Sequence, residues 1–256
     1  MQSSTQLPDY PITRLSEATT VVIPAFNEAP SIGSIVAALS DAARWREILV
    51  VDDGSTDGTG EKISALAGEF PVRLVVRENP SLGLSGAVVA GARAAAGDLL
   101  VVMDADLSHP PGRIPDLVRP LRENVCEMVI GSRYVRGGTT PGWPLWRKIM
   151  SRAASAFAYP LTRVHDSMCG FFAIPRSLLL ERAPAATGFK IAFEIIVQSH
   201  HKLRVQEIPI AFRDRAQGAS KMTFRVAAIF FFRWLAAIVR RGRGPAAGAA
   251  AQARVR

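Results

Sequence analysis

The chain has few cysteines and no apolar stretch at its start. Cys126 and Cys169 are the two cysteines among 256 residues, and neither stands in a C-x-x-C or metal-ligand pattern. We therefore expect two reduced thiols in a cytoplasmic protein. The first 20 residues are polar and lack the apolar region of a secretory signal. We expect residues 1–18 to be a flexible leader and the protein not to be exported.

The chain also lacks an apolar run long enough to cross a membrane. The best candidate, residues 226–239, has 14 residues and contains Arg233, whereas a spanning helix needs about 20 apolar residues. Its basic residues share one stripe of a helical wheel and the rest of the surface is apolar, which predicts that residues 223–241 form an amphipathic helix in a membrane interface. An ordinary helix covering the sheet is the alternative. The stripe consists of Lys221, Arg225, Arg233 and Arg240, and residues 242–256 are predicted to be a disordered basic Ala/Gly tail.

Several common nucleotide-binding and hydrolase motifs are absent. No G-x-G-x-x-G opens a helix, no G-x-x-x-x-G-K-[ST] phosphate loop occurs, and no serine stands in G-x-S-x-G. These absences argue against a dinucleotide-binding enzyme, a phosphate-loop ATPase and an α/β hydrolase. The formal net charge is +9, but no nucleic-acid motif with stacking aromatics accompanies it. We therefore expect phosphorylated substrates and a membrane surface as partners, and no nucleic acid.

Apolar strands and amphipathic helices alternate regularly in the first half of the chain. This order predicts a doubly wound, mostly parallel α/β sheet. Ser55 is expected to cap the helix that starts at Thr56, and Pro209 places the last strand at a sheet edge. Strands are expected at residues 21–24, 48–51, 72–76, 99–103, 127–131, 170–174 and 205–212, and helices at 31–44, 56–67, 84–96, 115–122, 146–159 and 193–200.

Polar, mostly acidic residues follow three of these predicted strands. The run 99–103 is followed by Asp104 and Asp106, the run 48–51 by Asp52 and Asp53, and the run 21–24 by Asn27 and Glu28. Open α/β sheets bind ligands at the carboxyl ends of their strands. Two carboxylates spaced i and i+2 suit Mg²⁺ or Mn²⁺, which commonly hold a substrate's phosphates. The pattern predicts one nucleotide site built from adjacent strand ends, with a strand-end turn capped by carboxylates as the alternative.

Seven short motifs follow one another along the chain. They are residues 22–28 (VIPAFNE), 50–57 (VVDDGSTD), 103–110 (MDADLSHP), 131–134 (GSRY), Asp166 with Gly170-Phe171, 193–195 (FEI) and 212–215 (FRDR) through Gly218, Ser220 and Lys221. In this order they resemble a family 2 glycosyltransferase with a GT-A fold. Within that group the chain is most similar to dolichol-phosphate (polyprenol-phosphate) mannose synthases, over about residues 19–225. The resemblance implies a catalytic domain over residues 19–222, followed by the amphipathic helical extension.

The resemblance implies a role for each matching position. Asp104 and Asp106 would hold Mg²⁺ or Mn²⁺, with Ser108 standing where these synthases usually carry a glutamine ligand. Arg133, Arg147 and Ser151 would bind the lipid phosphate, or would be solvent-exposed residues of an amphipathic surface. The expected catalytic set is Asp104, Asp106, Arg133 and Arg215, and the expected nucleotide-sugar set is Pro24, Asn27, Glu28, Asp52, Asp53, Asp104, Arg215 and Lys221.

The implied reaction is inverting transfer of mannose from GDP-mannose to polyprenyl phosphate, giving a β-linked product at the cytoplasmic face of the membrane. A separate membrane-anchor subunit is a plausible partner. Ser108 keeps open a UDP-sugar donor of the glucose type, and a non-catalytic membrane scaffold is a third reading. Arg233-Trp234 lacks the preceding glutamine of processive polysaccharide synthases, so polymer synthesis is not expected. His109 and His165 stand in loops and are expected to be structural rather than catalytic bases.

Overall fold

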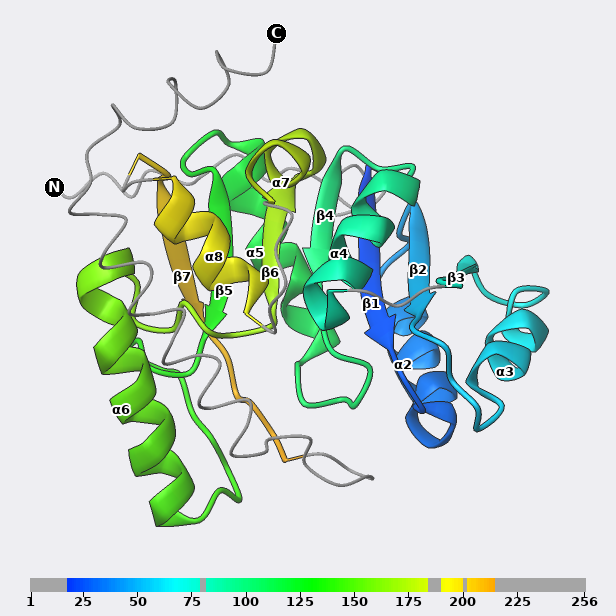
Figure 1. Ribbon diagram of the computed structural model, residues 1–256, viewed down its shortest axis with the longest axis horizontal. Coiled ribbons are helices and arrows are strands. Elements are labelled where there is room, and N and C mark those ends of the chain that lie inside the picture. Colours follow the sequence, from blue (N-terminus) through cyan, green and yellow to red (C-terminus); the bar gives the residue numbers. More distant parts are fainter. Residues whose placement is uncertain (1–17, 79–81, 184–189, 200–201, 215–256) are drawn as a thin grey trace, which may run out of the picture.

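One seven-stranded sheet forms the centre of the computed structural model, which describes residues 18–78, 82–183, 190–199 and 202–214 (Figure 1). The strand order is β3-β2-β1-β4-β6-β5-β7. All pairs among β1 to β4 are parallel, β6 runs antiparallel to β4 and β5, and β5 and β7 are parallel. The strands are β1 (Thr19–Ala25), β2 (Glu47–Asp52), β3 (Val72–Val76), β4 (Leu99–Val102), β5 (Met128–Ser132), β6 (Phe172–Pro175) and β7 (Val205–Pro209).

Helices cover both faces of the sheet (Figure 1). Helices α4 (Gly83–Ala94), α7 (Arg176–Arg182) and α8 (Ile191–Gln198) lie on one face. Helices α2 (Ala29–Ala42) and α5 (Ile114–Arg122) lie on the other, with α3 (Thr59–Leu66) beside α2 and the short 3-10 helix η1 (Pro111–Arg113) before α5. Helix α6 (Leu145–Thr162) projects at the end of the sheet and contacts α8. This arrangement confirms the predicted mostly parallel α/β sheet.

Burial in the core explains why β1, β2 and β4 could be predicted from their apolar runs. Every residue of β1, β2 and β4 is buried, as a parallel sheet covered on both faces requires. The largest fully buried side chains include Phe171 and Phe172, which connect this core to the antiparallel strand. The edge position predicted for the last strand is confirmed, because within the described part of the chain β7 pairs with β5 alone.

The loop before α3 departs from the prediction. The helix begins at Thr59 rather than Thr56, because Gly58 adopts a left-handed conformation with φ +88° at its N-cap. Ser55 does not cap this helix. Its hydroxyl donates to Asp52 and accepts a hydrogen bond from the backbone N–H of Asn27. The other unpredicted features are the short helix α7 and the reversed direction of β6.

Among the described residues, no helix combines the length and the apolar character needed to span a bilayer. The predicted leader falls outside the described residues except for its last residue. The predicted interfacial helix at 223–241 and the tail at 242–256 also lie outside them.

Candidate functional site

The three acidic strand ends meet at one edge of the sheet, as predicted. Ala25 at the end of β1 is in register with Asp52 at the end of β2. On the other side, Val22 of β1 is in register with Val102, two residues before Asp104. This edge is the carboxyl end of four parallel strands, where open α/β sheets bind their ligands.

Asn27 joins the loops that follow β1 and β2. Its backbone N–H donates to Ser55 Oγ at 2.8 Å, and its side-chain oxygen accepts the N–H of Thr56 at 2.9 Å. Its φ is +55°, a left-handed conformation that asparagine tolerates better than most residues. Pro24 lies just before this loop within β1, and the Glu28 carboxylate accepts from Ser31 at its far end. Asn27 therefore shapes the predicted nucleotide site through its hydrogen bonds to the second loop.

Asp52 and Asp53 have different environments despite being neighbours. Asp52 is buried and accepts hydrogen bonds from the backbone and hydroxyl of Ser55. The Asp53 carboxylate forms an ion pair with Arg77 at 2.5 Å. Burial raises the pKa of Asp53, and the Arg77 guanidinium opposes that rise. The charge of Asp53 is thus compensated within the protein, whereas the neighbouring Asp52 has no such ion pair among the described residues.

Asp104, Asp106 and Ser108 carry oxygen-bearing side chains in the loop that follows β4. Asp106 is buried and accepts the backbone N–H of Ser108 at 3.0 Å, across a turn in which Leu107 has φ +62°. The Asp104 side chain is 36% exposed. Ser108 Oγ is buried and makes no hydrogen bond within the described part of the chain. A buried hydroxyl without a partner is costly unless a ligand satisfies it.

This group suits a hard divalent cation in the donors that it offers. Carboxylate and hydroxyl oxygens are the ligands that Mg²⁺ and Mn²⁺ prefer, and Mg²⁺ commonly takes one or two carboxylates together with substrate phosphates. The described residues contain no cluster of three or more His, Cys, Asp or Glu side chains that would form an all-protein metal cage. Asp104 and Asp106 with Ser108 therefore fit a cation whose remaining ligands come from substrate and water.

His109, which was expected to be structural rather than a catalytic base, lies at the centre of the site. Its ring is buried, stacks on Phe171 at 5.1 Å between centroids, and lies edge-on to Phe212 at 5.2 Å. Nδ1 accepts the backbone N–H of Asp104 at 3.2 Å. Burial lowers the pKa of His109, while Asp104 and Asp106 oppose that change. The geometry assigns His109 a positioning role, because a neutral ring accepting at Nδ1 holds the Asp104 backbone.

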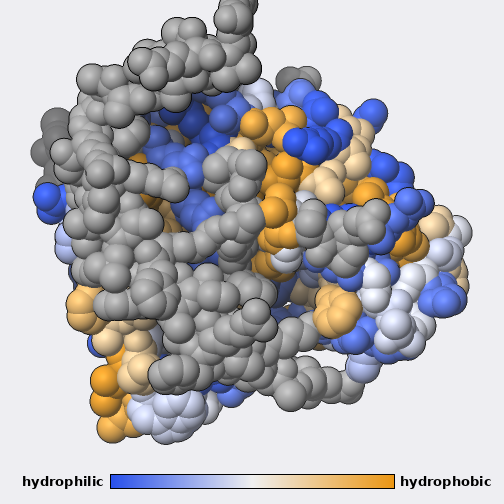
Figure 2. Space-filling model, viewed as in Figure 1, coloured by the Kyte–Doolittle hydropathy of each residue, from blue (hydrophilic) through white to orange (hydrophobic). Residues whose placement is uncertain are grey.

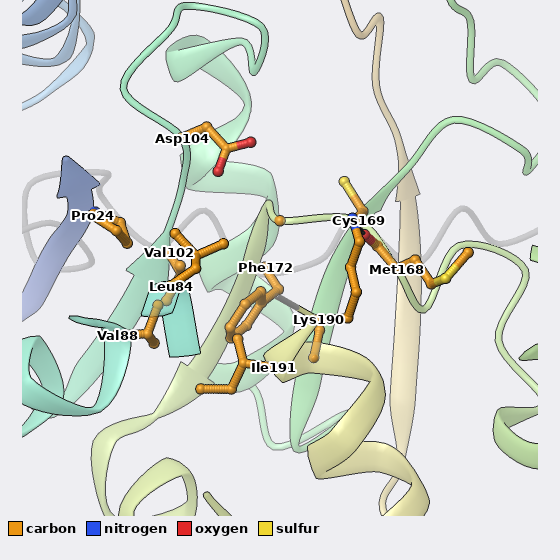
Figure 3. Close-up of a pocket in the computed structure, with 12 residues that line it drawn as sticks. Pro24, Leu84, Val88, Val102, Asp104, Met168, Cys169, Phe172, Lys190 and Ile191 are labelled. Carbon is orange, nitrogen blue, oxygen red and sulfur yellow. Dashed lines mark hydrogen bonds between the residues drawn. The ribbon is translucent and has the colours of Figure 1, made fainter. Parts of the chain in front are cut away.

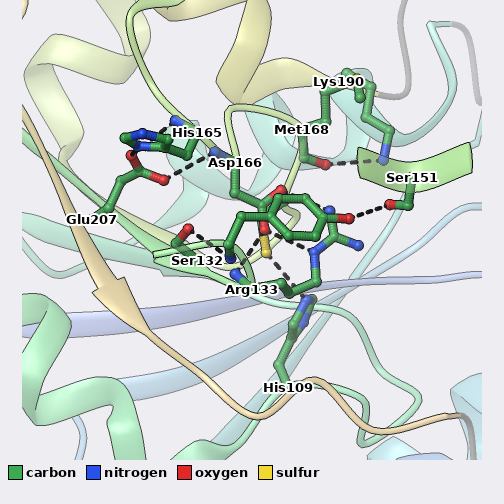
Figure 4. Close-up of polar contacts among 11 residues, drawn as sticks. His109, Ser132, Arg133, Ser151, His165, Asp166, Met168, Lys190 and Glu207 are labelled. Atoms are coloured by element: carbon green, nitrogen blue, oxygen red, sulfur yellow. Dashed lines mark hydrogen bonds and ion pairs between the residues drawn. The ribbon is translucent and has the colours of Figure 1, made fainter. Parts of the chain in front are cut away.

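Arg133 is held rigidly by Asp166 (Figure 4). Its Nε and Nη2 atoms donate to the two carboxylate oxygens, each at 2.7 Å, and its backbone N–H donates to the same carboxylate at 2.9 Å. Asp166 has no exposed side-chain surface. Glu207 of β7 accepts the backbone N–H groups of His165 and Asp166 at 2.8 and 2.9 Å. Glu207 therefore holds the Arg133–Asp166 pair from strand β7, although Glu207 and Asp166 are 41 positions apart in the sequence.

The three predicted lipid-phosphate residues gather around two aromatic side chains. The Arg147 guanidinium carbon lies 3.9 Å from the ring centroid of Trp143, and that of Arg133 lies 5.5 Å from it. Ser151 forms a 2.6 Å hydrogen bond with the Tyr134 hydroxyl. Tyr134 belongs to the motif at residues 131–134 without an assigned role, and Trp143 belongs to none of the motifs. The structure brings Arg133, Arg147 and Ser151 together.

Arg147 also forms a 2.6 Å ion pair with Asp214. This contact lies at the end of the described residues, so Arg215 and Lys221, both predicted to bind the nucleotide sugar, lie outside them. A small cavity opens beside Asp104 and contains Lys190, a residue that the sequence did not single out. Figure 3 shows this cavity.

Three comparisons identify the relatives of this chain. The profile of the family described as glycosyl transferase family 2 matches residues 20–182. A dolichol-phosphate mannosyltransferase of Pyrococcus furiosus is 39% identical over 208 residues, which cover 79% of this chain and 58% of the relative. The enzyme of the same name from Mycosarcoma maydis is 38% identical over 227 residues, which cover 84% of this chain and 76% of the relative. The chain thus spans less than two thirds of the Pyrococcus protein.

The fold agrees with a solved glycosyltransferase. The crystal structure of glucosyl-3-phosphoglycerate synthase from Mycobacterium tuberculosis, in complex with Mn²⁺, UDP-glucose and phosphoglyceric acid, superposes with a TM-score of 0.67 at 23% identity. The match covers 95% of this chain and 88% of the solved one. This likeness supports the GT-A type of sheet that the motifs implied. The family profile and the sequence relatives show that the chain belongs to glycosyltransferase family 2.

Proposed function

We propose that this protein transfers mannose from GDP-mannose to a polyprenyl phosphate with inversion. The observation that carries the proposal is the loop between α6 and β6, which joins two groups of residues. At one end of this loop, Asp166 holds Arg133 beside Tyr134 and Trp143. At the other end Gly170 lies so close to Asp104 that an added Cβ would meet its carboxylate at 3.2 Å. This proximity supports a single site that contains the strand-end carboxylates together with Arg133 and Arg147. The names of the sequence relatives support mannose as the sugar and a lipid phosphate as the acceptor.

On the donor side, the carboxyl ends of β1 and β2 would bind the nucleoside through Pro24, Asn27 and Asp52. Asp104, Asp106 and the free hydroxyl of Ser108 would hold Mg²⁺ or Mn²⁺. When bound, the cation would supply Lewis-acid stabilisation of the leaving diphosphate. His109 would keep the Asp104 backbone in place through the hydrogen bond to Nδ1.

On the acceptor side, the nucleophile needs positioning rather than deprotonation. A phosphate monoester is an anion at neutral pH, so two cations and a hydroxyl suffice to hold it near the sugar. Arg147 is the cation best placed to change partner, because its ion pair with Asp214 is half-exposed. Arg133 would add charge from its fixed position. A phosphate oxygen then bonds to C1 of mannose while the C1–O bond to GDP breaks, and the bonding electrons leave with GDP.

Helix α6 supports a location at a membrane surface. The exposed apolar side chains of α6 form two adjacent rows with a spacing of four residues along the helix. They therefore share one face of the helix. Basic side chains on the same helix border this face, which is typical of an interfacial helix. Figure 2 shows the apolar group at the lower left. We propose the cytoplasmic face, with a separate membrane-anchor subunit as a candidate partner. The apolar group is Leu145, Trp146, Ile149, Met150 and Phe157, and the bordering cations are Arg147, Lys148 and Arg152.

The decisive experiment is transfer of labelled mannose from GDP-mannose to a short polyprenyl phosphate with Mg²⁺ or Mn²⁺. We expect a lipid-linked product with the native chain and a loss of about a hundredfold or more with Asp106→Ala. Asp41→Ala, which removes an exposed carboxylate from α2, should leave the rate unchanged. Absence of product from the native chain, with the lipid and either cation present, would contradict the proposal.

Ser108 favours a second candidate with the same fold, a transferase that takes a UDP-sugar of the glucose type. A serine hydroxyl reaches less far than the glutamine amide that the mannose synthases usually carry there, which alters the cation site. Calorimetric titration with GDP and with UDP separates the candidates. Micromolar binding of UDP without binding of GDP would establish the UDP-sugar reading.

A further inference from the structure

A cavity beside Asp104 brings polar groups together within apolar walls (Figure 3). Pro24, Val102 and Phe172 contribute from the ends of β1, β4 and β6. Lys190 lines it from the start of α8, and Figure 3 places Asp104 on another wall. Asp104 of the proposed cation group therefore lines the same cavity as Lys190. The remaining lining residues are Leu84, Val88, Met168, Cys169, Gly170, Ile191 and Ala192.

Lys190 is the unusual member of this cavity. Its ammonium donates to the backbone carbonyl of Met168 at 3.0 Å, its one hydrogen bond to a described residue. Burial lowers the pKa of Lys190, nearby Arg133 lowers it further, and Asp104 opposes both. An ammonium group carries three N–H donors, and a buried amine that is only partly satisfied is costly. The cavity therefore presents hydrogen-bond donors that this contact leaves available to a ligand.

The polar groups of the cavity suit a neutral polyol better than an anion. Lys190 donates, whereas Asp104 and the carbonyl of Met168 accept, and a sugar hydroxyl both donates and accepts. The carboxylate would repel a phosphate placed beside it, and the apolar walls would not solvate one. The aliphatic and aromatic side chains instead match the C–H surface of a hexose ring, as in most small-molecule sites.

We propose that this cavity is the subsite for the transferred sugar and that Lys190 donates a hydrogen bond to one of its hydroxyl groups. The inference rests on the proposed function for the identity of the donor as a sugar nucleotide. It adds a specific binding residue and a specific location for the hexosyl group. Lys190 would thereby contribute to the choice of sugar, while the nucleoside is bound at the ends of β1 and β2.

Calorimetric titration tests the subsite by comparing GDP-mannose with GDP, which lacks the sugar. Lys190→Met should weaken GDP-mannose binding about 10- to 100-fold and leave GDP binding within about twofold, because a hydrogen bond from a charged group is lost. Lys190→Gln, which keeps an N–H donor, should lose less. Lys62→Met is the matched control, since Lys62 also donates to a backbone carbonyl, that of Ala29, and it should change neither titration.

Two outcomes would overturn the inference while leaving the proposed function standing. If Lys190→Met weakened GDP and GDP-mannose equally, the ammonium would contact the diphosphate. If it weakened neither, Lys190 would not face the donor. Failure of the native chain to bind GDP-mannose would instead contradict the proposed donor, and the same comparison would then be made with UDP-glucose and UDP.

Deoxy donors give a test that does not depend on the stability of the variants. With the native chain, removal of one particular hydroxyl from the mannose should weaken binding about tenfold or more. In the Lys190→Gln variant, removal of the same hydroxyl should weaken donor binding clearly less, because the substitution and the missing hydroxyl affect the same hydrogen bond. If the native chain bound every monodeoxy donor within about twofold of GDP-mannose, no hydroxyl would be held by Lys190 and the inference would fail.

Discussion

The Asp166 carboxylate is fully buried and paired with Arg133. Both of its oxygens bind Arg133, and its backbone N–H donates to Glu207. The ion pair is nearly inaccessible to solvent, with 0% of the Asp166 side chain and 9% of the Arg133 side chain exposed. Removing one partner of a buried pair leaves an uncompensated charge, which costs far more than losing an exposed pair. Asp166 is therefore a structural requirement for the arginine cluster.

We predict that Asp166→Asn lowers the free energy of unfolding by about 3 kcal/mol or more, because Arg133 keeps its charge without a charged partner. Urea unfolding followed by circular dichroism measures the change. Asp214→Asn is the matched control, since Asp214 pairs with Arg147 at a half-exposed position, and it should cost less than about 1 kcal/mol. Equal effects of the two variants would show that burial of the Arg133 pair is not what matters.

Gly170 controls the position of the Asp104 carboxylate. An added Cβ would lie 3.2 Å from one carboxylate oxygen and 3.4 Å from the other. Because Asp104 is partly exposed, its side chain can move away at little cost in stability. We predict that Gly170→Ala slows sugar transfer about tenfold or more without a large change in melting temperature, since small displacements of catalytic groups are costly.

The control for Gly170→Ala is Gly112→Ala in η1, where an added Cβ would meet no atom within 4 Å. This variant should transfer sugar at the native rate. A Gly170→Ala protein with native activity would contradict the idea that contact at this glycine positions the carboxylate. A large loss of stability would instead place the effect in the fold.

Most elements were predictable, and the exceptions have physical causes. Strands β1 and β2 extend beyond the predicted apolar runs by one or two residues at each end. Polar residues such as Thr20 and Asp52 are also buried and paired in the sheet, and apolar character alone does not reveal them. Helix α7 has seven residues and one buried side chain, Leu179, which is too little periodicity to read. The reversed direction of β6 leaves no mark in its own residues, since direction is set by the connection and not by composition.

Helix α6 carries the testable consequence of the membrane proposal. Ile149 and Met150 are 58% and 65% exposed, which is unusual for large apolar side chains in neighbouring positions. We predict that Ile149→Gln with Met150→Gln weakens association with anionic lipid vesicles about tenfold or more, because two apolar groups lose their transfer into the interface. Co-sedimentation with vesicles measures the bound fraction.

Val125→Gln is the matched control for the helix α6 variant. Val125 is 56% exposed, but it precedes β5 and stands at the opposite end of that strand from the site. It should leave vesicle association unchanged. Equal binding by the native chain and the α6 variant would remove helix α6 from the membrane proposal and leave the rest of the chain to account for any association.

At the scale of the whole molecule, both cysteines report on global unfolding. Cys126 and Cys169 are unpaired and buried, as expected for reduced thiols. Burial raises the pKa of both, that of Cys169 to about 12, with Asp166 adding to the rise at Cys169. The raised values mean that the folded state retains protons that the unfolded thiols lose. The cysteine contribution therefore lowers the free energy of unfolding as pH rises from about 9 toward 12.

We predict that an Ellman-type thiol reagent at pH 8 modifies neither cysteine of the native protein on a timescale of minutes. Both should react at once in denaturant, because reaction needs an accessible thiolate. Absorbance of the released chromophore gives the number of thiols in each condition. Rapid modification of one thiol without denaturant would show that the region around it opens locally. The free energy of that opening would be well below the free energy of global unfolding.

The features that could be predicted from the sequence alone are those that depend on local patterns of residues. Apolar runs that end in Asp52, Asp104 or Asn27 specify buried strands with polar ends, and the ordered motifs specify the family. Contacts between residues that are distant in the chain became visible only in the folded structure. Arg133 meets Asp166 across 33 positions, and Lys190 meets Met168 across 22. Such contacts depend on which loops the sheet order brings together, and no local periodicity encodes that order.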